Sequence, residues 1–137
     1  KIKKKKNVVK SLEKLQQHYS ARGINLICIG YRGYGHSNGI PDMNNILTDS
    51  IILFDTIIND LINNKNMIIV MGRSLGSIPA CEIIAKRREK IDAVIIESGF
   101  ANEDPLFKLI GITAEEAGFD IKDGFLNGEK IKKYRMS

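Results

Sequence analysis

A serine bracketed by glycines at the end of an apolar run constrains this chain more than any other feature of its sequence. The run Asn66–Met71 leads directly into Gly72-Arg73-Ser74-Leu75-Gly76, which reads Gly-x-Ser-x-Gly, and a helical apolar pattern follows from Ile78. A serine on a tight turn between a buried strand and a helix is lifted clear of the backbone, as a nucleophile requires. Gly72 and Gly76 lack a Cβ, so we expect both to make room for a strained turn at Ser74.

Apolar periodicity predicts that helices and strands alternate along most of the chain. Helical spacing of apolar residues is present at 7–21, 42–62 and 78–88. Short runs rich in branched apolar residues, typical of covered strands, are present at 24–29, 67–71 and 91–97. The remainder is more polar, and short helices are expected at 105–110 and 113–117. Because strands that alternate with such helices form βαβ units, the sequence predicts the α/β class, with a parallel sheet in a three-layer α/β/α sandwich.

The composition is that of one globular domain. The chain has 137 residues, of which 43% are hydrophobic and 27% charged. Its apolar clusters are far shorter than the roughly 18 residues of a spanning helix, so no membrane partner is expected. Cys28 and Cys81 match no metal or redox spacing and lie in apolar patterns, which predicts buried free thiols and a reducing, cytoplasmic setting. No cofactor or metal is expected, and the glycine-rich loop at 31–39 lacks the ending of a phosphate-binding loop.

The net charge of +5 owes much to the first six residues, five of which are lysines. A nucleic-acid-binding arm is one interpretation of this run. A solvated terminus is the favoured interpretation, because neither aromatic residues nor arginines are interleaved with the lysines. We therefore expect no nucleic-acid partner.

A serine nucleophile needs a general base, and the sequence offers only two histidines. His18 lies near the polar side of the first helix, where a solvated role is expected. His36 follows the first predicted strand and is a conceivable base, although a loop-packing or exposed role is favoured. Glu97 ends the third predicted strand and is a conceivable acid, although capping of the next turn is favoured. The N–H of Leu75, the residue after the serine, is the expected oxyanion donor.

Three motifs together resemble the α/β-hydrolase superfamily, in particular its serine-aminopeptidase-like and Bem46-like hydrolases. They are Tyr31-Arg32-Gly33-Tyr34-Gly35, Gly72-Arg73-Ser74-Leu75-Gly76 and Ile95-Ile96-Glu97-Ser98-Gly99-Phe100, in the family's order and spacing. The resemblance implies a partial α/β-hydrolase fold in which Ser74 is the nucleophile and Leu75 the oxyanion donor. It also implies acyl transfer from a small-molecule ester or a peptide-like substrate.

The resemblance also implies that parts of the family's fold are missing. In the family, a strand with a His-Gly loop precedes the first helix, and the acid and base follow two later strands. We therefore expect 1–137 to be a single partial domain with its core at 7–100 and an irregular or helical segment at 101–137 leading to an absent strand. Such a fragment would be weakly active or inactive and could self-associate through exposed sheet edges. The alternative is a non-catalytic binding or interaction domain that retains the serine turn.

Overall fold

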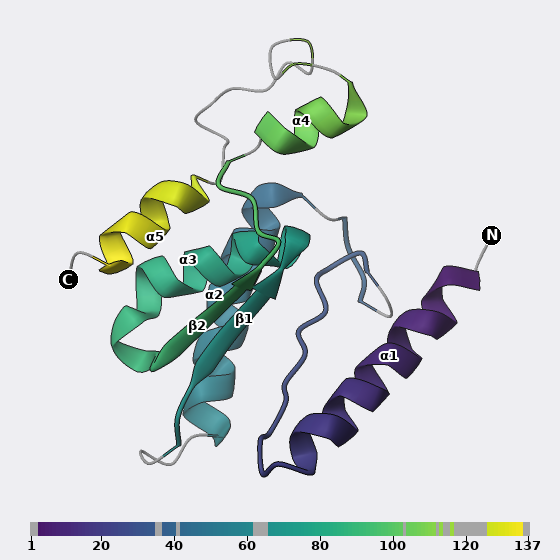
Figure 1. The fold of residues 1–137 in the computed structure, drawn as a ribbon, viewed down its shortest axis with the longest axis vertical. Coiled ribbons are helices and arrows are strands. Elements are labelled where there is room, and N and C mark those ends of the chain that lie inside the picture. The colour runs from purple at the N-terminus through teal and green to yellow at the C-terminus, as the bar shows by residue number, and fades with distance from the viewer. Residues whose placement is uncertain are drawn as a thin grey trace. The chain divides into compact units, whose positions relative to one another are not determined.

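The structure, a computed structural model, is drawn in Figure 1. It describes residues 3–34, 37–40, 42–61, 66–102, 104–111, 113, 116 and 126–135. The chain divides into two compact units, residues 1–41 and 42–137. None of the helices in the described ranges has the length and apolar character needed to cross a membrane.

The described part of residues 1–41 includes the helix α1 (Lys3–Ser20), which confirms the helix expected at 7–21. The turn after the helix contains Gly23, whose φ of 72° is the left-handed conformation that commonly terminates helices. The amide of Gly23 donates a hydrogen bond to the Ser20 carbonyl at 3.0 Å, and that of Ile24 to the Tyr19 carbonyl at 3.1 Å. These bonds satisfy carbonyl groups at the end of α1 and turn the chain away from the helix axis.

The strand expected at 24–29 is wrong, because this run is neither helix nor strand in the structure. A strand needs a neighbour for its backbone hydrogen bonds, and the described part of residues 1–41 contains no second strand. The run is not covered on both faces either, since Ile24 is 44% and Ile27 is 50% exposed. Cys28 is consequently exposed, which corrects the expectation of a buried thiol there.

The unit of residues 42–137 confirms the alternation of helices and strands. Its helices are α2 (Met43–Leu61), α3 (Ser77–Arg87), α4 (Asp104–Ile110) and α5 (Asn127–Arg135), and its strands are β1 (Ile69–Arg73) and β2 (Ala93–Glu97). Two short 3₁₀ turns, Ser74–Gly76 and Arg88–Lys90, flank α3. The helix expected at 113–117 falls largely outside the described residues. A helix over Asn127–Arg135 was not specifically predicted.

The two strands pair in parallel, with Ile69 opposite Ala93 and Arg73 opposite Glu97. Because side chains alternate along a strand, Val70 and Val94 share one face of the sheet and Met71 and Ile95 the other. The first face packs against a buried apolar cluster. The cluster consists of Phe54 from α2, Ile83 and Ile84 from α3, and Ile91, which precedes β2. The second face is open, with Met71 and Ile95 each 46% exposed. The unit is therefore α/β and forms part of an α/β sandwich.

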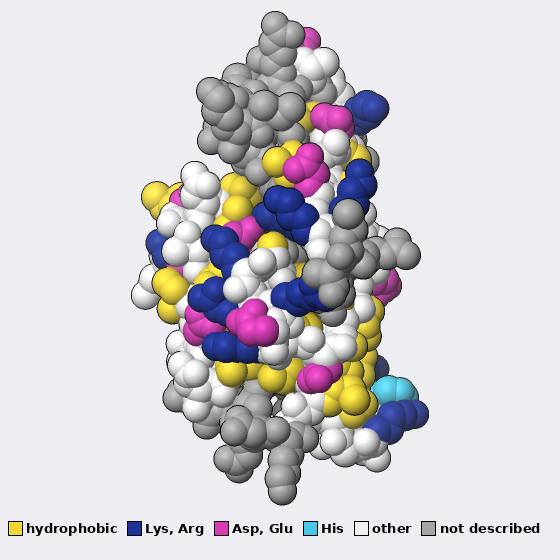
Figure 2. Space-filling model, turned by 90° about the vertical axis from the view of Figure 1, so that its left-hand side faces the viewer, with side chains coloured by type: hydrophobic (Ala, Val, Ile, Leu, Met, Phe, Trp, Pro, Cys, Tyr) yellow, Lys and Arg dark blue, Asp and Glu magenta, His cyan; other side chains and the backbone are white. Residues whose placement is uncertain are grey.

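Helix α5 lies beside α3 (Figure 1) and is joined to it by an ion pair of Lys130 with the buried Glu82, which also pairs with Lys86 of its own helix. The Glu82 carboxylate lies 2.6 Å from Lys86 Nζ and 2.5 Å from Lys130 Nζ. Burial by itself raises the pKa of Glu82, but the hydrogen bonds from Lys130 and Lys86 outweigh it and hold the pKa below its ordinary value of 4.5. In Figure 2, basic and acidic side chains are likewise interspersed over the face shown.

Lys130→Met should destabilise the protein at neutral pH by about 1–3 kcal/mol, because Glu82 remains buried with only Lys86 to compensate its charge. A lowered pKa contributes stability above 4.5 that is lost as the pH falls, so the two proteins should converge in strongly acidic solution. Urea unfolding across this pH range measures the difference. Lys132→Met, at an exposed position of the same helix, is the control. Equal losses in both variants would contradict the role of Lys130.

Candidate active site

Ser74 occupies a sharp turn at the carboxyl end of the sheet. Strand β1 reaches it through Arg73, whose φ of −114° and ψ of 132° are extended. Ser74 itself has a φ of 51°, and the 3₁₀ turn it opens leads directly into α3. A positive φ at a residue other than glycine costs on the order of 1–3 kcal/mol, so the turn is strained. The residue is exposed. This is the strand–turn–helix geometry that the Gly-x-Ser-x-Gly pattern predicts.

The two glycines of the motif have different roles. A Cβ at Gly72 would lie 2.4 Å from the Gly76 carbonyl oxygen and 2.7 Å from the Ala80 Cβ, so the end of β1 is packed directly against the start of α3. The expectation for Gly72 is confirmed. The expectation for Gly76 is wrong, because its φ is −65° and a Cβ there would meet nothing within 4 Å. Gly76 takes part in the close approach through its carbonyl group.

The backbone of the turn leaves a hydrogen-bond donor beside Ser74. The amide of Ser77 donates to the Ser74 carbonyl and so closes the 3₁₀ turn. Leu75 is the second residue of this turn, and the first N–H groups of a helical turn have no partner within it. The Leu75 residue is 55% exposed. Whether its N–H donates to an anion that forms next to the serine hydroxyl stays a prediction.

Relief of the strained turn gives a direct stability test. Ser74→Gly should raise the free energy of unfolding by about 1 kcal/mol, because glycine adopts a φ of 51° without steric cost. The matched control is Leu75→Gly, at an exposed residue of the same turn, which should destabilise by up to about 1 kcal/mol. Thermal or urea unfolding of both variants checks the signs. A loss of stability in Ser74→Gly would show that the turn is not strained.

Glu97 lies at the same sheet edge and is engaged by Arg73. The two residues are opposite each other in the strand register, and the Arg73 Nε lies 3.3 Å from Glu97 Oε1. Both side chains are well exposed, at 73% and 49%, so the attraction is weakened by solvent. The structure thus gives Glu97 an arginine partner across the strands; whether it acts as a catalytic acid stays a prediction.

A role for either histidine as the base for Ser74 stays a prediction. His18 is exposed near the end of α1, as expected, and its carbonyl accepts a hydrogen bond from Arg22 at 2.9 Å. His36 lies outside the described residues. Residues 42–137, the unit that contains Ser74, include no histidine at all.

The loop after β2 is a part of this edge that sequence reasoning missed. Ser98 has a φ of 48°, nearly that of Ser74, and it directly follows the strand residue paired with Arg73. Parallel strands lie about 4.8 Å apart, so the two strained serines leave the sheet side by side. The Ser98-Gly99 pair at the end of an apolar run was the signal that could have indicated this second turn.

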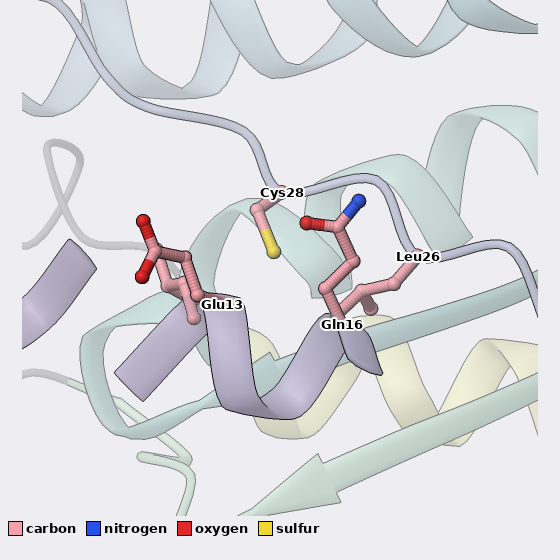
Figure 3. Close-up of a pocket in the computed structure, with 5 residues that line it drawn as sticks. Glu13, Gln16, Leu26 and Cys28 are labelled. Atoms are coloured by element: carbon pink, nitrogen blue, oxygen red, sulfur yellow. The ribbon is translucent and has the colours of Figure 1, made fainter. Parts of the chain in front are cut away.

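A separate hollow of about 210 Å³ lies in the unit of residues 1–41 (Figure 3). Its lining comes from α1 and from the segment that follows it: Leu12, Glu13, Gln16, Leu26 and Cys28. In the close-up, the Cys28 side chain lies between those of Glu13 and Gln16. Across the described ranges, no three His, Cys, Asp or Glu side chains are grouped in a way that could hold a metal ion.

The sequence profile of the serine aminopeptidase family S33 matches residues 7–118, which include the Ser74 turn. The chain belongs to this family. Its fold is accordingly a partial α/β-hydrolase fold, and the resemblance inferred from the three motifs is confirmed. No solved structure matches the chain significantly.

Three relatives show how much of their own length the chain covers. It is 36% identical to the protein bem46 of Schizosaccharomyces pombe over 84 residues, 61% of this chain and 28% of that protein. It is 31% identical to the lysophosphatidylserine lipase ABHD12 of Bos taurus over 61% of this chain and 21% of the relative. It is 28% identical to the α/β-hydrolase domain-containing protein WAV2 of Arabidopsis thaliana over 70% and 31%, respectively. The chain therefore spans less than a third of the length of these relatives.

Proposed function

We propose that this S33 family member is a serine hydrolase that cleaves carboxylic esters or amide bonds through Ser74. The observation that carries the proposal is the positive φ of Ser74 on a turn between β1 and α3. Strain of this kind persists at functional sites, and here it exposes the hydroxyl at the carboxyl edge of the sheet. The names of the relatives support both bond classes, since the family is one of aminopeptidases and ABHD12 is a lipase.

In the proposed reaction, the Ser74 Oγ attacks the carbonyl carbon of the substrate while its proton passes to a general base. The carbonyl oxygen becomes an oxyanion that accepts a hydrogen bond from the Leu75 N–H. Collapse of this intermediate breaks the bond to the leaving alcohol or amine, which takes the proton from the base. Water then hydrolyses the acyl-serine by the same steps and restores Ser74. We place the general base outside residues 42–137, which contain no histidine.

A fluorophosphonate probe tests the proposal, because it forms a stable phosphonyl ester with an activated serine. In a chain that also carries the general base, we expect the probe to modify the folded protein at Ser74, as mapped by mass spectrometry of the peptides, and to leave the urea-unfolded protein unmodified. Labelling of other serines without Ser74, or equal labelling of Ser74 after unfolding, would exclude an activated nucleophile at Ser74. Turnover of nitrophenyl esters and of aminoacyl nitroanilides then separates ester from amide substrates.

A non-catalytic binding domain is the second candidate, favoured by the absence of histidine from residues 42–137. In that case, the serine turn is retained because it joins β1 to α3. A chain extended to the full length of the relatives distinguishes the two candidates. Labelling of Ser74 in the extended chain supports the hydrolase, whereas an unreactive Ser74 there supports the binding domain.

A further inference from the structure

Asn127, the first residue of α5, is fully buried and reaches the loop after β2. Its Nδ2 donates a hydrogen bond to the Phe100 carbonyl at 2.9 Å. The amide of Gly128 donates to the Ala101 carbonyl at 2.8 Å. The Oδ1 of Asn127 has no hydrogen-bond partner among the described residues. The side-chain N–H donor of Asn127, not its side-chain oxygen, therefore joins α5 to the loop beside the backbone bond from Gly128.

The other side of the same loop is joined to the turn that carries Ser74. The Phe100 amide donates to the Oγ of Ser77 at 3.2 Å, and Ser77 is fully buried in the first turn of α3. The amide of Ser77 in turn donates to the Ser74 carbonyl. A continuous series of hydrogen bonds thus runs from α5 through residue 100 to the backbone of the serine turn.

The loop has almost no room to shift within this series. A Cβ at Gly99 would lie 3.0 Å from the Ser77 Cβ and 2.4 Å from Ile96 Cγ2, so the loop is pressed against α3. The preceding residue, Ser98, holds a strained φ of 48°. A backbone in such a conformation persists only where its surroundings fix it. Asn127 supplies part of that restraint from an element that follows the loop by more than 20 residues.

We propose that Asn127 is a positioning residue for Ser74: it clamps residues 98–101 against the first turn of α3 and thereby steadies the turn on which the serine lies. This inference rests on the proposed function, because positioning matters only if Ser74 reacts. It makes α5 part of the framework of the active site, although α5 contributes no group to the chemistry.

Hydrogen exchange in the Asn127→Ala and Asn127→Asp variants tests the clamp. Aspartate keeps the shape of asparagine but has no N–H to donate, so both variants lose the bond to Phe100. We expect the amides of Phe100 and Gly128 to exchange about tenfold faster, and that of Ser77 at least about threefold faster. The amides of Ile83 and Ile84 in the core serve as internal references and should keep their rates.

Lys130→Met is the matched control, since it weakens the attachment of α5 to Glu82 while leaving Asn127 in place. At equal loss of global stability, we expect faster Ser77 exchange and slower labelling of Ser74 by the fluorophosphonate in the Asn127 variants only. The proposal would be overturned if the Ser77 amide exchanged at an unchanged rate in the Asn127 variants. It would also be overturned if Lys130→Met accelerated Ser77 exchange and slowed Ser74 labelling as the Asn127 variants do.

The variant Ser77→Ala tests the proposal independently, in case the Asn127 variants do not fold. Ser77→Ala breaks the series at its other end and should speed the exchange of Phe100 while leaving Gly128 unchanged. The proposal would be overturned if Ser77→Ala accelerated the exchange of neither the Phe100 amide nor the Gly128 amide. Exchange reports the clamp whether or not Ser74 reacts. A wild-type chain that carries the general base and shows the clamp but never labels would therefore count against the proposed function alone.

Discussion

Replacement of Gly72 with alanine is expected to lower the free energy of unfolding by about 3 kcal/mol. The added Cβ would lie 2.4 Å from the Gly76 carbonyl oxygen and 2.7 Å from the Ala80 Cβ. Neither atom belongs to a flexible side chain, so β1 and α3 must separate to accept the methyl group. The separation loosens the packing of the sheet on the helix, where residues such as Ile84 are buried. Urea unfolding followed by circular dichroism measures the loss.

Gly76→Ala is the control for this effect, because the same atom is added four residues further along. A Cβ at Gly76 meets nothing within 4 Å, and the φ of −65° suits alanine. We expect the stability to stay within about 1 kcal/mol of the wild type, with a gain favoured because alanine restricts the unfolded chain. Similar losses at the two glycines would show that the close approach at Gly72 does not exist.

The difference between these glycines marks the limit of what the motif predicted. The Gly-x-Ser-x-Gly pattern and its flanking apolar periodicity are local, and they correctly predicted a strand, a strained serine and a helix. Which glycine is sterically required depends on atoms brought together by the turn, such as the Ala80 Cβ. The pattern treats both glycines alike because it carries no information about those contacts.

The run at 24–29 shows the same limit for strands. Its branched apolar residues are typical of a covered strand, yet the structure has none there, and Cys28 is exposed. Strand propensity reflects packing against neighbours, and residues 1–41 supply no neighbouring strand in the described part. By contrast, α1 was predictable because a helix satisfies its hydrogen bonds within its own segment.

Helix α5 could not be predicted from its pattern, because few of its residues are apolar. It is held by polar contacts with residues distant in the sequence, those of Lys130 with Glu82 and of Asn127 with Phe100. Such pairs have no local periodicity that would reveal them. Sequence analysis therefore did not predict the conformation of the loop at 98–101 or its contacts with α5. This part of the candidate site is built from long-range polar contacts.

Ser74→Ala should abolish labelling by the fluorophosphonate and, in a chain that carries the general base, reduce ester hydrolysis at least about a thousandfold. The substitution removes the attacking oxygen and leaves the Leu75 N–H in place. A φ of 51° strains the backbone of alanine and of serine to a similar extent, so the free energy of unfolding should change by less than about 0.5 kcal/mol. Loss of activity at unchanged stability would assign the effect to the missing oxygen.

Ser98→Ala is the control that isolates Ser74 from its surroundings. Ser98 is also exposed, has a φ of 48° and follows the paired residue of the neighbouring strand, so the two serines share backbone strain and sheet edge. They differ in the backbone after each serine, because Ser74 opens a helical turn with an N–H donor beside it, whereas Ser98 precedes a loop packed on α3. If strain and exposure were sufficient for reactivity, both substitutions would reduce labelling. We expect Ser98→Ala to label within about twofold of the wild type, because we propose an oxyanion donor, the Leu75 N–H, for Ser74 alone.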